Sequence, residues 1–178
     1  MIMSRRTRKL VLTAHVATSV GWLGADLVVL ALAVAVVASR DPDTVRGAYL
    51  AMQVSAWTVL VPLSVASLAT GIVQSLGTTW GLVRHYWVLI KLVLNVVATV
   101  VLLAYTRTLA ELARIAAQPT WSDDDLTVLR TPTVLIHSIG ALILLVTATV
   151  LAVYKPAGVT PWWQRRAPLR AVSARAAH

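Results

Sequence analysis

Charged residues divide the chain into long apolar stretches. Residues 47–83 and 131–154 carry no charge, and two further apolar runs, 10–38 and 87–110, carry three formal charges between them. A hydrocarbon core about 30 Å thick is crossed by a helix of roughly 20 apolar residues, so each stretch is long enough to span a membrane. The pattern predicts an all-α fold, an integral membrane four-helix bundle whose helices cover about 9–39, 43–76, 82–116 and 123–154.

Local sequence signals support these boundaries. Asp41 followed by Pro42 is typical of a helix start, because the carboxylate caps free amides and a first-turn proline needs no N–H donor. Residues 122–125 have the spacing of a capping box, which predicts a short turn that bends at Pro132 before the fourth helix. Pro62 should interrupt the second helix near its middle.

Composition excludes several classes of protein. Of the 178 residues, 58% are hydrophobic and 13% are charged, and the chain has no cysteine. Soluble domains carry about a quarter charged residues, so the composition favours lipid as the solvent. Disulfides, thiolate metal sites and iron–sulfur clusters are excluded. Hydrolase and nucleotide-binding motifs are also missing from the sequence.

The formal net charge of +9 indicates topology rather than nucleic-acid binding. The basic residues lie at helix edges and in the tails, not on one face interleaved with aromatic residues. Ten Lys and Arg residues fall on one side and five on the other, which predicts that both termini are cytoplasmic in a multi-pass protein of a bacterial inner membrane. The basic tail, 156–178, is expected to be surface-bound or disordered beside anionic lipid. The richer side holds Arg5, Arg6, Arg8, Lys9, Arg84, Lys155, Arg165, Arg166, Arg170 and Arg175.

Polar residues inside the spans are costly and mark candidate functional positions. His15 lies six residues after Lys9, and Lys91 lies seven residues after Arg84, so both are roughly 10 Å inside the same edge of the membrane. A neutral imidazole is a good axial ligand for haem iron, and a desolvated amine could take the opposite side. This depth match predicts a shared cofactor site.

Other residues are assigned to that site by their helical spacing. Arg84 at the rim could pair with a haem propionate, and His85 is the reserve second ligand. Trp22, Trp87 and Asn95 are candidates to line the cofactor. The alternatives are structural: His15 as a packing residue bonded to a serine or carbonyl, Lys91 snorkelling to the interface, His85 placed at the interface, and the tryptophans, Trp57 included, as packing residues between the helices.

A second polar layer is predicted nearer the other membrane face. Asp26 and His137 fall at similar depth, where a carboxylate and an imidazole would lower each other's cost of burial. Such a pair could be a proton relay, a metal or second haem site, or a mutually satisfied structural contact. The candidate metal ligands of the chain are therefore His15, His137 and Asp26.

Two segments carry a resemblance to a known family. These are His15 with the following VGWLGA, residues 20–25, and the run WGLVRHYWVLIKLVLN, residues 80–95, preceded by Thr70-Gly71. With them the chain resembles four-helix bacterial membrane proteins that include HemJ-type haem-dependent protoporphyrinogen IX oxidases and CopD-like copper-resistance domains, within an uncharacterised subgroup. The resemblance implies haem b binding at His15 and Lys91.

Three functional hypotheses follow. The leading one is a cytochrome b-type membrane protein that acts in oxidoreduction or electron transfer with a quinone or porphyrin-like substrate, as a haem-dependent membrane oxidoreductase. The second is a non-catalytic accessory or assembly subunit, working as a homo-oligomer or with a membrane protein partner. The third is a small-cation transporter of the copper type, which the scarcity of methionine disfavours, since soft thioethers suit Cu(I).

Overall fold

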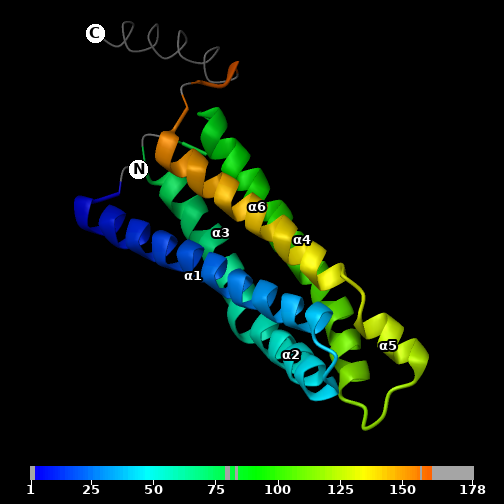
Figure 1. Ribbon diagram of the computed structural model, residues 1–178. Helices are drawn as coiled ribbons and strands as arrows, with labels where there is room; N and C mark the ends of the chain where they lie inside the picture. Colours follow the sequence, from blue (N-terminus) through cyan, green and yellow to red (C-terminus); the bar gives the residue numbers. More distant parts are fainter. Residues whose placement is uncertain (1–2, 79–80, 83, 157, 162–178) are drawn as a thin grey trace, which may run out of the picture.

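A computed structural model describes residues 3–78, 81–82, 84–156 and 158–161 of this chain. Every secondary-structure element longer than a single β-bridge in these residues is a helix. Figure 1 shows four long helical rods lying side by side, with a short helix at one end. The elements in order are α1 (Arg5–Ala38), α2 (Pro42–Ser55), the π-helical turn η1 (Ala56–Leu60), α3 (Val61–Leu76), α4 (Tyr86–Ala116), α5 (Asp123–Leu129) and α6 (Thr133–Tyr154).

The rods form a closed ring of neighbours. α1 packs against α3 and α6, and α4 packs against the same two partners, so α1 and α4 face each other across the bundle. The start of α1 and the end of α6 lie at one end, here called the terminal end, while α5 and the loop between α1 and α2 lie at the far end (Figure 1).

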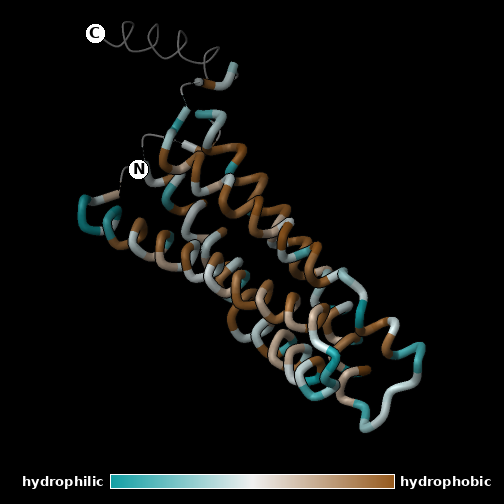
Figure 2. The backbone as a smooth tube through the Cα atoms, viewed as in Figure 1, coloured by the Kyte–Doolittle hydropathy of each residue, from teal (hydrophilic) through white to brown (hydrophobic). Residues whose placement is uncertain are grey.

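Four segments are long and apolar enough to cross a membrane, which confirms the predicted four-pass bundle: Arg5–Ala38, Pro42–Leu76, Tyr86–Ala116 and Asp123–Tyr154. Figure 2 shows hydrophobic residues along the length of the rods and hydrophilic residues gathered at their ends. Large apolar side chains face outward along every span, among them Val20 (62% exposed), Val100 (57%) and Ile143 (60%). Such surfaces suit acyl chains and not water.

The helix boundaries differ from the predicted ones only at their ends. α1 begins at Arg5 and not near residue 9, because the Ser4 hydroxyl accepts a hydrogen bond from the Thr7 amide at 3.2 Å. α4 begins at Tyr86 and not near residue 82, since His85 has an extended backbone with φ −116° and ψ 135°. A turn at Pro132 separates α5 from α6, as predicted.

The interruption predicted at Pro62 takes the form of a π-helical turn. Proline has no N–H to donate and its ring crowds the carbonyl four residues earlier, so the preceding turn widens into η1. The turn places Ala56 and Leu60, both buried, on the inside of the bundle. It therefore shapes the interior of the bundle at mid-span.

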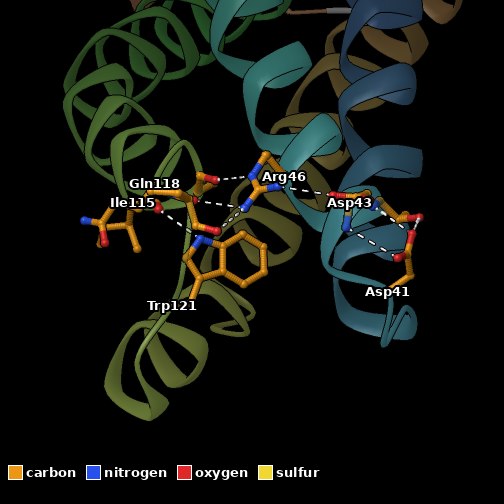
Figure 3. A network of polar contacts seen from close by, with 9 residues as sticks. Asp41, Asp43, Arg46, Ile115, Gln118 and Trp121 are labelled. Atoms are coloured by element: carbon orange, nitrogen blue, oxygen red, sulfur yellow. Dashed lines mark hydrogen bonds and ion pairs between the residues drawn. The ribbon is translucent and has the colours of Figure 1, made fainter.

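An arginine ties α2 to the end of α4 at the far end (Figure 3). Arg46 donates from Nε to the Ala116 carbonyl at 3.0 Å and from Nη2 to the Gln118 carbonyl at 2.9 Å. Its Nη1 pairs with Asp43 at 3.1 Å, and its guanidinium lies 5.1 Å from the ring centre of Trp121. One side chain therefore satisfies carbonyls that the end of α4 leaves without helical donors.

Asp41 caps α2, as its sequence predicted. Its Oδ2 accepts hydrogen bonds from the Thr44 hydroxyl at 2.6 Å and from the Thr44 amide at 2.9 Å. The hydroxyl contact first, and then the amide contact, lower the pKa of the Asp41 carboxyl. A lowered folded-state pKa means that the cap stabilises the protein above the ordinary aspartate pKa and loses this effect as the pH falls below it.

We expect Asp41→Ala to lower the thermal midpoint slightly at pH 7, because three hydrogen bonds from the start of α2 are lost. Melting both proteins in detergent at pH 7 and again at about pH 3 measures the effect, and the difference should shrink at the lower pH as the wild-type carboxyl is protonated. An equal difference at both pH values would show that the charge of Asp41 does not contribute.

Candidate cofactor site

The ring of His15 is held by the backbone of α3. Its Nδ1 lies 3.1 Å from the Ser67 carbonyl oxygen and 3.2 Å from Thr70 Oγ1. The Thr70 hydroxyl itself donates to the Ala66 carbonyl at 2.6 Å, so it can only accept from the ring. Nδ1 therefore carries the proton, and the lone pair lies on Nε2.

Gly71 makes room for this ring. A Cβ atom at Gly71 would lie 3.0 Å from His15 Cε1 and 3.4 Å from Nδ1, which is too close for an undisturbed contact. A glycine at this position thus lets the imidazole lie flush against α3. The Thr70-Gly71 pair noted in the sequence acquires a structural reason: the threonine contacts the ring and the glycine leaves space for it.

A polar cluster joins three helices beside His15. Ser19 Oγ and Ser67 Oγ are 2.8 Å apart, and the Asn95 amide nitrogen donates to Ser67 Oγ at 3.3 Å. Asn95 Oδ1 is buried without a hydrogen-bond partner. Ser67 is thus the centre of this cluster, a role that the sequence showed only as a small residue in the second span.

Lys91 reaches the same region from α4. Its Nζ lies 4.7 Å from the ring centre of Trp87, and Asn95, one turn further along α4, is the residue that donates to Ser67. Trp87 is one turn nearer the terminal end and is buried. The structure therefore brings His15, Lys91, Trp87 and Asn95 toward one part of the bundle, from α1 and the facing helix α4.

Arg84 and His85 lie at the terminal end, just before α4. The Arg84 carbonyl accepts a hydrogen bond from the Thr160 amide at 2.9 Å, and His85 forms a single β-bridge with Val159. The His85 ring centre is 6.4 Å from that of Trp87. His85 is the residue that precedes the first turn of α4, at the terminal end of the bundle.

Trp22 and Asp26 belong to a separate layer nearer the far end. Trp22 is 2% exposed and Asp26 is 3% exposed, and both line a cavity of about 390 Å³ between the four spans. Trp22, expected beside the His15 site, contributes to this cavity because it lies two turns further along α1. Trp57, expected to pack between the helices, is instead 56% exposed on the outer surface.

His137 lines the same cavity from α6. Its Nδ1 lies 2.7 Å from the Thr133 carbonyl oxygen, and its ring stacks on Tyr105 with centres 4.0 Å apart and planes 21° apart. The predicted shared layer of Asp26 and His137 is thus present, but among the described residues they form no ion pair with each other. Nor does the described part of the chain hold a cluster of three or more His, Asp or Glu side chains arranged for a metal ion.

Comparisons with family models, with characterised proteins and with solved structures found no match for this chain. The geometry of the two layers is therefore the evidence on which a functional assignment rests. Trp80 and the basic tail from Trp162 onward lie outside the residues that the structure describes.

Two features of these layers could not be predicted from the sequence. One is the anchoring of His15 to the Ser67 carbonyl, since backbone acceptors leave no trace in residue identity. The other is the cavity, whose walls come from four helices far apart in the sequence. Small residues opposite Asp26, such as Ala98 and Gly140, were the only signal for it.

Proposed function

We propose that this chain is a membrane-embedded b-type haem protein that exchanges electrons with a lipid-soluble partner, a quinone or a porphyrin-like molecule, in a bacterial inner membrane with both termini cytoplasmic. The observation that carries the proposal is the state of His15: its Nδ1–H is bound by the Ser67 carbonyl, which leaves Nε2 as the free donor atom. Metal-ligating histidines are commonly oriented in this way by a carbonyl partner. The resemblance to HemJ-type oxidases supports the same residue.

Two features around His15 support this proposal. The ring is held from one side by α3 through Ser67, Thr70 and Gly71. Asn95 Oδ1 is buried without a hydrogen-bond partner, so a donor on a bound group would satisfy it. When bound, the haem supplies one-electron chemistry that none of these side chains can supply alone. The protein fixes the imidazole, excludes water and sets the polarity around the metal ligand.

Two residues are candidates for the opposite side. Lys91 comes from the facing helix, one turn before the Asn95 that bonds Ser67, and its Nζ lies 4.7 Å from the ring centre of Trp87. His85 lies at the start of α4 beside the same tryptophan. We assign Lys91 as the favoured second ligand, with Trp87 as the contact that holds its side chain.

The direct test is an absorption spectrum. Protein produced in haem-replete cells and purified in detergent should show a Soret band, with a sharp α band after dithionite reduction. Lys91→Met should keep the haem but change the Soret position and the spin state, whereas His85→Ala should leave both unchanged. A colourless wild-type protein that is folded by circular dichroism would contradict the proposal and would favour an accessory or assembly subunit.

A further inference from the structure

The cavity at Asp26 contains a buried acid with unsatisfied bonding capacity. Asp26 is 3% exposed, and its Oδ2 is buried without a hydrogen-bond partner. No described cation pairs with it. An unpaired polar group in an apolar site costs several kcal/mol, so a donor on a bound molecule would relieve this cost. The acid thus points to a ligand with at least one hydrogen-bond donor.

His137 offers a second acceptor in the same cavity. Because its Nδ1–H is bound by the Thr133 carbonyl at 2.7 Å, Nε2 is the atom left to accept. The stacking of Tyr105 on the imidazole fixes the plane of the ring. Asp26 on α1 and His137 on the neighbouring α6 therefore present two acceptors to one space, and a ligand with two donors fits them best.

The rest of the cavity is apolar and reaches the surface of the bundle. Its walls include Met52, Leu60 of the π-helical turn and Leu144. Two lining residues, Val101 of α4 and Ile136 of α6, are 45% and 61% exposed, so the cavity opens between these helices toward the lipid. A volume of about 390 Å³ falls in the range of small-molecule sites. The ligand would enter from the bilayer.

We propose that this cavity binds a lipid-soluble hydroquinone, with the aromatic ring between the apolar walls, one hydroxyl donating to Asp26 Oδ2 and the other to His137 Nε2. An acyl chain would fill the volume but leave Asp26 unsatisfied. A metal ion would find two protein ligands where stable sites use three or more. The binding stands on the cavity alone and does not depend on the haem proposed at His15.

The experiment measures binding of one defined probe. The protein is placed in nanodiscs under argon with dithionite, and reduced decylubiquinone is titrated while tryptophan fluorescence is recorded, because Trp22 lines the cavity. We expect saturable quenching by the reduced form and weaker binding of the oxidised form, measured without dithionite. At Asp26 Oδ2 and His137 Nε2 the carbonyl oxygens of the oxidised ring would meet acceptors, so the two hydrogen bonds proposed for the reduced form would be lost.

Two variants locate the site. Asp26→Asn replaces one carboxyl oxygen with an NH₂ donor and should weaken binding about tenfold, which corresponds to the loss of one good hydrogen bond. Gly140→Leu should abolish binding, since Gly140 lines the cavity and a Cβ there meets no atom within 4 Å, so the new side chain fills free space. Thr99→Val is the control: Thr99 is also buried, on α4 beside Ala98, but it does not line the cavity.

The outcomes separate the proposals. Haem absorbance recorded on the same samples should be unchanged in Asp26→Asn, so a failure of quinol binding is distinguished from a failure of the haem site. Quenching that is equal in wild type and Gly140→Leu, or that appears only with the oxidised form, would overturn the proposal. Stabilisation by Cu⁺ or Zn²⁺ that requires Asp26, with no saturable quinol binding, would overturn it in favour of a cation site.

Discussion

Replacing His15 with alanine should remove the Soret band, because the imidazole held by the α3 backbone is then gone. His137→Ala is the matched control, since His137 is also a membrane-span histidine bonded to a carbonyl but lies in the other layer. Haem content per protein, measured by the pyridine haemochrome method, should fall to background in the first variant and stay at the wild-type level in the second. The reverse result would move the cofactor to the Asp26 layer.

A second variant tests the orientation of the ring without touching it. Gly71→Leu introduces a Cβ that would lie 3.0 Å from His15 Cε1, and we expect the rest of the leucine side chain to displace the imidazole from the Ser67 carbonyl. Loss of such an orienting contact costs roughly tenfold or more in metal affinity. Gly24→Leu is the control, because no atom lies within 4 Å of a Cβ at that position. Equal haem retention by both variants would contradict the orienting role of α3.

The sequence predicted the fold well because the membrane imposes few solutions. Charge-free stretches long enough to cross a hydrocarbon core must be helical, so the number of spans follows from the positions of the charges. The capping residues Asp41 and Ser122 act through their own next turn, and both were predicted correctly. Local rules of this kind need no knowledge of the tertiary structure.

The two polar layers were predicted less completely, because the sequence gives the depth of a residue in the membrane but not the direction in which its side chain faces. Counting residues placed His15 with Lys91 and Asp26 with His137, but it gave no rotation of the helices. His15, Trp22 and Asp26 lie along one face of α1, and Trp22 already lines the Asp26 cavity. The sequence had instead placed Trp22 beside His15. Trp57 was expected to pack between the helices but faces outward, because the rotation of its helix could not be predicted from depth.

Arg46 shows what sequence reasoning misses at the ends of helices. In the sequence it is one of the basic residues at a helix edge, whereas in the structure it binds carbonyls some 70 positions away, at Ala116 and Gln118. Backbone acceptors at a helix end are common to all sequences, so nothing in the residue pattern indicates which arginine will reach them. The nearby Trp121 lies under this guanidinium and donates to the Ile115 carbonyl.

Arg46→Ala should therefore be strongly destabilising. It leaves the Ala116 and Gln118 carbonyls without their donor and removes the Trp121 contact, for a loss of about 3 kcal/mol in the free energy of unfolding. For a chain of this size that corresponds to a drop of roughly 10 °C in thermal midpoint, measured in detergent by circular dichroism. Arg46→Lys should fall in between, since a single ammonium cannot serve both carbonyls and Asp43 with the geometry of a guanidinium.

The control is Arg114, whose contact with Glu111 at 2.8 Å joins two side chains that are each 66% exposed. Exposed pairs three residues apart contribute a few tenths of a kcal/mol, so Arg114→Ala should shift the midpoint by about 1 °C. If both alanine variants have the same thermal midpoint, the hydrogen bonds of Arg46 contribute no more to stability than a surface ion pair. If only Arg46→Ala melts early, the junction of α2 with the end of α4 depends on this one side chain, because it supplies donors that the backbone of α4 cannot supply at its own end.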